Sequence, residues 1–150
     1  DHGLCIVREM LTARPQRKST RLAEALRRFS NSTRQHCITF ILSDFLDSGF
    51  EDALKVAGKK HDIIGIKVYD KMDMQLPEVG LLAIQDAESG KTGWVDTNDA
   101  VVRSNYQADF FAHTEYCKNI FLKAGCDLLH IRTDEDYVKV LQKFFISRNA

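Results

Sequence analysis

The run Cys37-Ile38-Thr39-Phe40-Ile41-Leu42 is the stretch from which the fold of this chain is predicted. It is continuous, largely apolar and rich in β-branched residues, and it is too short for a core helix. Such a run is typical of a strand that is buried on both faces of a sheet, and burial of this kind favours parallel pairing. Residues 62–69 and 128–132 form two further runs of the same type. We therefore expect at least three parallel strands.

Helical spacing of apolar residues separates these strands. Residues 50–58 follow this pattern, and Ser48-Gly49-Phe50-Glu51 fits a capping box at the start of the helix. A strand, a helix and a second strand in this order imply a right-handed parallel crossover. A long helix is expected from about residue 99 to residue 124, where Gly125 is the natural stop. A last helix is expected after Thr133-x-x-Asp136.

Two more features complete the predicted organisation. Residues 2–11 form a short helix candidate, and residues 22–29 form another with Thr20 as its N-cap. Residues 80–85 and 92–95 flank the turn Glu88-Ser89-Gly90-Lys91 and predict a β-hairpin, inserted at about residues 78–97. The fold class is therefore α/β, with residues 1–150 in one domain.

Composition limits the possible functions. The chain has 150 residues and no net charge, so a general nucleic-acid binder is not expected. No apolar run approaches the ~18 residues that a membrane helix needs. Residues 1–36 nevertheless carry eight basic side chains against three acidic ones. The basic segment 8–34 is either a solvated helical face or a site for an anionic partner.

The cysteines and the N-terminus indicate the compartment. Cys5, Cys37, Cys117 and Cys126 form no C-x-x-C pair and have no zinc-site spacing, which predicts free thiols in a reducing, cytoplasmic setting. The chain opens with Asp1 rather than Met and shows no signal-peptide pattern. We therefore expect a processed or excised piece of a longer protein.

Oxygen ligands follow each of the three predicted strands. Asp44, Asp70 and Asp134 all come directly after a strand, at the edge where ligands of parallel sheets bind. Such oxygens suit Mg²⁺, although carboxylates at these positions also cap the following helices. Phosphate-binding glycine loops and a nucleophile elbow do not occur in the sequence. The five scattered histidines are interpreted as packed or partly exposed side chains rather than as catalysts.

Several ordered segments resemble the second half of a von Willebrand factor A-like domain. More specifically, they resemble a bacterial family of unknown function with that fold, often encoded beside MoxR-type AAA+ ATPases. The similarity covers essentially the whole chain. The segments that carry it are 20–26, 40–45, 49–54, 68–70 with 76–77 and Gly80, and 132–137.

The resemblance implies a metal site that is incomplete in this chain. In the family, a metal-ion-dependent adhesion site uses a D-x-S-x-S loop, a downstream Thr and a downstream Asp. Thr20 matches the Thr and Asp44 matches the Asp, whereas the D-x-S-x-S loop does not occur here. The resemblance thus implies a partial von Willebrand factor A-like (Rossmann-like) sheet whose first strands are missing. Mg²⁺, expected in the intact domain, should bind this chain weakly or not at all.

The function implied by the resemblance is that of a non-enzymatic protein-interaction module. Its partner would be a MoxR-type ATPase or a client of that ATPase, in an assembly or chaperone role. The alternative is a Mg²⁺-dependent Rossmann-like hydrolase that uses Asp44 and Asp70 on a phosphorylated substrate. Strand 37–42 would also present an open apolar edge, which predicts self-association through this strand.

Overall fold

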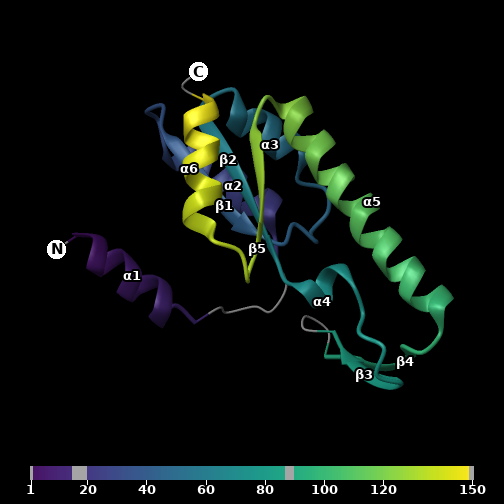
Figure 1. Ribbon diagram of the computed structural model, residues 1–150. Helices are drawn as coiled ribbons and strands as arrows, with labels where there is room; N and C mark the ends of the chain where they lie inside the picture. Colours follow the sequence, from purple (N-terminus) through teal and green to yellow (C-terminus); the bar gives the residue numbers. More distant parts are fainter. Residues whose placement is uncertain (1, 15–19, 87–89, 149–150) are drawn as a thin grey trace.

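The computed structural model describes residues 2–14, 20–86 and 90–148 (Figure 1). The elements are α1 (His2–Thr12), α2 (Leu22–Ser32), β1 (Ile38–Ser43), α3 (Glu51–Gly58), β2 (Asp62–Tyr69), α4 (Lys71–Met74), β3 (Leu81–Gln85), β4 (Thr92–Asp96), α5 (Ala100–Ala124), β5 (Asp127–Arg132) and α6 (Tyr137–Arg148). No helix within the described ranges has the length and apolarity to cross a membrane.

The main sheet has three strands in the order β1-β2-β5, and both pairings are parallel. Ile41 pairs with Gly65, which in turn pairs with Leu128 on the other side. This confirms the predicted α/β class and its three parallel strands, in a Rossmann-like arrangement with flanking helices. Strand β1 lies at one edge of the sheet, as the family resemblance implied.

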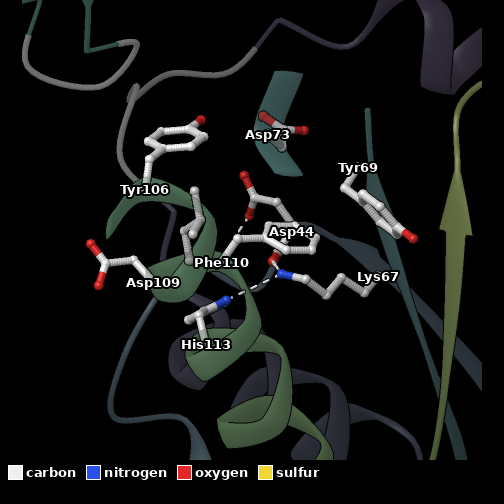
Figure 2. Close-up of a pocket in the computed structure, with 9 residues that line it drawn as sticks. Asp44, Lys67, Tyr69, Asp73, Tyr106, Asp109, Phe110 and His113 are labelled. Carbon is white, nitrogen blue, oxygen red and sulfur yellow. Dashed lines mark hydrogen bonds between the residues drawn. The ribbon is translucent and has the colours of Figure 1, made fainter. Parts of the chain in front are cut away.

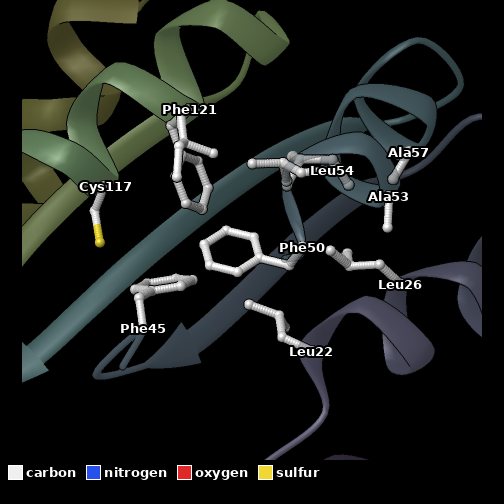
Figure 3. Packing of buried hydrophobic residues seen from close by; sticks show 11 residues of the cluster. Leu22, Leu26, Phe45, Phe50, Ala53, Leu54, Ala57, Cys117 and Phe121 are labelled. Atoms are coloured by element: carbon white, nitrogen blue, oxygen red, sulfur yellow. The ribbon is translucent and has the colours of Figure 1, made fainter. Parts of the chain in front are cut away.

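One side of the sheet, here called the three-helix face, is covered by α2, α3 and α5. Phe45, Phe50, Leu54 and Phe121 meet there, and each is at most 1% exposed (Figure 3). The rings of Phe45 and Phe121 contact edge to face, with centroids 5.1 Å apart. This face therefore holds the main hydrophobic core.

The opposite side, here called the one-helix face, is covered by α6 alone among the described elements (Figure 1). Helix α6 packs mainly on apolar residues of β2 and β5, namely Ile64, Ile66, Leu129 and Ile131. Its Phe145 also contacts Phe40 of β1 edge to face, with ring centroids 6.3 Å apart. The side chains of β1 on this face stay exposed: Ile38 at 58%, Phe40 at 45% and Leu42 at 64%. The prediction that strand 37–42 is buried on both faces is therefore wrong, because the contact of Phe145 with Phe40 leaves most of the β1 side chains on this face exposed.

Two predicted helix caps differ from those observed. Helix α2 has Arg21 as its N-cap, without a side-chain cap bond, and its first amide, on Leu22, donates to Oδ2 of Asp47 at 2.6 Å. The carboxylate of Asp47, which is distant in sequence, thus caps α2 in place of Thr20. Helix α3 begins only at Glu51 with Phe50 as N-cap, so the capping box at Ser48 does not form.

The predicted hairpin and the ends of the long helix are confirmed, whereas Asp136 rather than Thr133 accepts from an amide at the start of α6. Strands β3 and β4 form an antiparallel hairpin, and Gly90 has φ +71°, while Glu88 and Ser89 of the predicted turn lie outside the described residues. Asp99 caps α5 through the amide of Val101, and Gly125 ends this helix in the left-handed conformation. At 1.5 Å per residue α5 is about 37 Å long. It therefore extends beyond the sheet and reaches the hairpin (Figure 1).

The buried hydroxyl of Thr97 joins the hairpin to the start of α5. Its Oγ1 donates to the carbonyl of Gly80 at 2.7 Å and accepts from the amide of Val79 at 3.0 Å. Arg103 on α5 donates to the carbonyl of Thr97 and pairs with Glu78. These bonds fix the first half of α5, which forms one wall of the site described below.

Candidate functional site

The carboxyl ends of the three parallel strands meet at one edge of the sheet, here called the carboxyl rim (residues 43–47, 69–73 and 132–134). At the end of β1 the chain turns sharply, and Phe45 adopts φ +57°, which is rare for a bulky residue. Its ring is fully buried in the core. Two side-chain bonds hold this turn: Ser43 Oγ accepts from the amide of Phe45 at 3.0 Å, and Asp44 Oδ1 accepts from the amide of Leu46 at 3.1 Å. The strained turn leaves the carboxylate of Asp44 exposed.

Thr20, the other predicted metal ligand, belongs to a segment that reaches the same loop. The bond from the amide of Leu22 to Asp47 ties the start of α2 to the residues that follow β1. Thr20 is exposed and lies two residues before this bond. The structure thus brings the segment of Thr20 to the loop of Asp44, while coordination of a metal by the two side chains stays a prediction.

A buried lysine lies beneath the Asp44 turn. Lys67 on β2 is 2% exposed, and its Nζ donates to the carbonyl of Asp44 at 2.7 Å. Nζ also lies 3.2 Å from Nδ1 of His113, whose Nε2 lies 3.0 Å from the carbonyl of Phe45. Because an ammonium can only donate and a carbonyl can only accept, both bonds require a neutral imidazole that carries its proton on Nε2.

Burial lowers the pKa values of both Lys67 and His113. Desolvation lowers the pKa of Lys67 below its usual value, and nearby acidic groups oppose this shift. Desolvation, followed by the positive charge of Lys67, also lowers the pKa of His113. His113 is therefore neutral at neutral pH, in agreement with its hydrogen bonds.

Sequence reasoning did not single out Lys67 as a site residue. The residue lies in the strand Ile63-Ile64-Gly65-Ile66-Lys67-Val68, which was interpreted only as a buried strand. A lone lysine inside such a run was the available signal, because lysine is almost never fully buried unless it has partners. The partners come from elements far apart in the chain, so their identity required the tertiary structure.

These residues surround a hollow of about 430 Å³, here called the rim cavity (Figure 2). Its lining comes from the β1 turn, β2, α4 and α5, and combines carboxylates, aromatic rings and the Lys67–His113 pair. The lining residues are Asp44, Leu46, Lys67, Tyr69, Asp73, Tyr106, Asp109, Phe110 and His113. The position of the cavity is that in which open parallel sheets bind ligands.

The other two carboxylates that follow strands serve the structure. Asp70 is the N-cap of α4, where its Oδ1 accepts from the amides of Met72 and Asp73. Asp134 pairs with Arg132 and with Lys71. The alternative that these carboxylates cap the next helix is thus confirmed for Asp70, whereas Asp134 forms ion pairs and caps no helix. Of the three, Asp44 has an exposed carboxylate that makes neither a helix cap nor an ion pair with the described residues.

The donor set does not form a complete magnesium site. Within the described ranges, no group of three or more His, Cys, Asp or Glu side chains is arranged to hold a metal ion. The ammonium of Lys67 also lies next to the Asp44 turn, where its charge opposes a dication. Thr20 and Asp44 thus remain two donors of an incomplete set, and weak or absent Mg²⁺ binding stays a prediction.

The cysteines are free thiols, and two of them contact histidines. Cys117 is fully buried with its Sγ 3.6 Å from Nε2 of His113, and burial raises the pKa of its thiol. Cys37 lies with its Sγ 3.5 Å from Nδ1 of His61, which is 3% exposed. The interpretation of His61 and His113 as packed side chains is confirmed.

Much of the basic segment 8–34 is either paired or solvated. Arg21 and Arg28 both pair with Glu24, and Arg8 pairs with Glu9. Arg14, Arg27 and Arg34 are exposed, while Arg17 and Lys18 lie outside the described residues. These contacts favour the solvated helical face over an anion-binding site.

Comparisons with known proteins identify the family but no activity. The family described as "Protein of unknown function DUF58" matches residues 1–116. The uncharacterized protein MAV169 of Mycobacterium avium is 30% identical over 128 residues, which are 85% of this chain and 75% of that protein. Two further uncharacterized proteins, Mb1516 of Mycobacterium bovis and Rv1480 of Mycobacterium tuberculosis, are also 30% identical over 128 residues. This chain spans 40% of the length of each.

No solved structure gives a significant match to this chain. The family match covers more than half of the residues, and the Mycobacterium avium relative is matched over most of its length. On these grounds the chain belongs to the family of proteins of unknown function DUF58.

Proposed function

We propose that this chain is part of a von Willebrand factor A-like protein-interaction module that binds its partner at the carboxyl rim. The partner class is a MoxR-type AAA+ ATPase or a client of that ATPase, as the sequence resemblance implies. The observation that carries the proposal is the exposed carboxylate of Asp44, which a strained and well-bonded turn holds beside the rim cavity. A carboxylate fixed in this way is preorganised for recognition of a partner.

The same rim gives less support to the alternative, a hydrolase for phosphorylated substrates. That chemistry needs a second free carboxylate next to Asp44 and a set of backbone amides that cradles phosphate. Asp70, the second carboxylate of that hypothesis, is bonded to the first turn of α4. An interaction module requires neither group.

Magnesium enters the proposal as a ligand of the intact module. There a bound Mg²⁺ would accept a carboxylate from the partner, and Thr20 and Asp44 would be two of its ligands. Because the donors in this chain are incomplete, titration calorimetry with MgCl₂ should detect weak binding or none. A micromolar site that is lost in Asp44→Ala would overturn this part of the proposal.

The main test measures binding to a MoxR-type AAA+ ATPase from the same organism, by biolayer interferometry with the whole chain. Asp44→Ala should weaken binding by about tenfold or more, as expected for the loss of one charged contact. The matched control is Asp52→Ala on α3, where an exposed carboxylate has no ion pair with the described residues. This control should bind like the unaltered chain.

Two outcomes contradict the proposal. One is the absence of measurable binding, and the other is an equal effect of both substitutions. Hydrolysis of p-nitrophenyl phosphate that requires Mg²⁺ and disappears in Asp44→Ala would instead support the hydrolase.

A further inference from the structure

We infer that the rim cavity accepts a basic side chain, the guanidinium of an arginine, from the protein partner. The inference rests on the proposed function, because it names the group that the partner inserts beside Asp44 when no Mg²⁺ is bound there. It is drawn from the charges, the aromatic walls and the free hydrogen-bond acceptors of the cavity.

The charge at the mouth of the cavity is negative. Asp44, Asp73 and Asp109 line it, and all three are exposed. The opposing cation, Lys67, is 2% exposed and is bonded to the Asp44 carbonyl and to His113. It therefore contributes little to the surface that a ligand meets. The geometry thus favours a cationic ligand over an anionic one.

Each of the three carboxylates keeps acceptor capacity for a ligand. Asp109 on α5 makes no hydrogen bond or ion pair with the described residues. Asp73 uses Oδ2 for the amide of Asp70, and Asp44 uses Oδ1 for the amide of Leu46. The other oxygen of Asp73 and of Asp44 accepts no hydrogen bond from the described residues. A ligand with several donors can therefore be bound without disrupting an existing cap.

Aromatic rings form the walls of the cavity between these carboxylates (Figure 2). The rings of Tyr69 and Phe110 contact each other with centroids 5.1 Å apart. Tyr106 is fixed by a 3.0 Å bond from its hydroxyl to the carbonyl of Met72. The Nζ of Lys67 already lies 5.7 Å from the centroid of Phe110, so this wall holds one cation against an aromatic face. A second cation can be placed against Tyr106.

An arginine fits this arrangement better than a metal ion does. The carboxylates are spread around the cavity and do not form a cluster of three metal-ligating side chains within the described part of the chain. A guanidinium carries five N–H donors on a wide planar fork and stacks on aromatic rings. It can therefore contact separated carboxylates and one ring at the same time. An ammonium, which is a compact point charge, cannot do both.

The test uses two small probes that differ in charge but hardly in shape. N-acetyl-arginine amide and its neutral counterpart N-acetyl-citrulline amide are titrated into the full chain, and amide shifts are followed by NMR. The arginine probe should give saturable shifts at residues 106–113 and bind at least about fivefold more tightly than citrulline, as expected for one cation–π contact. Equal affinity of the two probes overturns the inference.

Substitutions locate the site. Asp109→Asn should weaken the arginine probe by about threefold or more, a loss typical of one exposed charged pair. Asp52→Asn is the matched control, since that carboxylate is equally exposed on α3 and lies outside the cavity. An unchanged affinity in Asp109→Asn contradicts the inference, and so does MgCl₂ that produces the same shifts at lower concentration. Thermal melts confirm that both variants fold.

The inference and the proposed function can fail separately. If the arginine probe does not bind but binding of the ATPase still requires Asp44, the proposed function is supported and the cavity accepts a group other than arginine. If the probe binds as described but the ATPase does not bind at all, the cavity remains an arginine site and the proposed partner is wrong. Measuring Asp109→Asn in the ATPase assay connects the two results.

Discussion

The two faces of the sheet differ sharply in how completely they are covered. On the three-helix face, Phe45, Phe50 and Leu54 are fully buried between the sheet and three helices. On the one-helix face, α6 covers β2 and β5 but leaves Phe40 and its neighbours on β1 exposed. Apolar burial is the dominant favourable term in folding. The free energy of unfolding should therefore depend mainly on the three-helix face. The exposed part of the one-helix face remains available for self-association.

The largest effect is expected from removing a ring on the three-helix face. Phe121→Ala should lower the free energy of unfolding by about 3–5 kcal/mol, because it leaves a cavity among Phe45, Gly65 and Cys117. Phe145→Ala on the one-helix face, where the ring is 37% exposed, should cost about 1 kcal/mol. Urea unfolding measures both. Similar losses for the two variants would show that the faces contribute equally.

A smaller loss is expected from adding a methyl group to the same face. A Cβ on Gly65 would lie 2.5 Å from Cζ of Phe121 and 2.9 Å from Cδ1 of Leu128, so β2 and α5 could not approach as they do. Gly65→Ala should therefore destabilise the protein by about 1–3 kcal/mol. Gly93→Ala on the hairpin, where nothing lies within 4 Å of the new atom, is the control. A neutral Gly65→Ala would show that the core on this face is loosely packed.

The exposed part of the one-helix face can be tested by measuring self-association of the chain. Strand β1 presents an edge that no described strand pairs with, and its exposed apolar side chains flank that edge. We expect self-association through this strand. Phe40→Lys should weaken it by about tenfold or more, whereas the stability of the monomer should fall by only about 1 kcal/mol through the lost contact with Phe145. Light scattering over a concentration series measures the effect. A chain that is monomeric at every concentration contradicts the prediction.

The smallest expected effect is a dependence of stability on pH that arises at the carboxyl rim. Burial and the charge of Lys67 hold the pKa of His113 below its usual value of about 6.5. The unfolded chain therefore binds more protons than the folded one in the window just below this value, and stability falls as the pH drops through it. His130, whose pKa burial also lowers, acts in the same direction.

His113→Gln should reduce this pH dependence. The urea midpoint of the variant should fall less between pH 7 and about pH 5.5 than that of the unaltered chain, although its stability at pH 7 will be lower. His36→Gln, at an exposed histidine, is the control and should keep the original slope. Identical slopes in all three proteins would show that His113 is not responsible.

Local sequence patterns predicted the order of elements because their signals lie within short windows. The runs at 37–42, 62–69 and 128–132 became strands to within one residue at either end, and Asp99 and Gly125 bounded the long helix as expected. The predicted cap at Thr20 failed because Asp47, which is distant from α2 in sequence, satisfies the first amide of that helix. The predicted capping box at Ser48 does not form because α3 begins only at Glu51. Contacts between distant residues leave no periodic pattern in the sequence.

The candidate site, too, was predicted in part from the sequence and in part only from the tertiary structure. Asp44 could be selected from the sequence alone, since the carboxyl ends of parallel strands share one edge whatever the details of packing. The burial of Lys67, its bond to the Asp44 carbonyl and the neutral state of His113 depend on how α5 crosses the sheet. The sequence thus determined the strands, the helices and the position of the rim, because these follow from local periodicity. Only the tertiary structure decided which face is covered and which groups share the rim cavity, because both result from contacts between segments far apart in the chain.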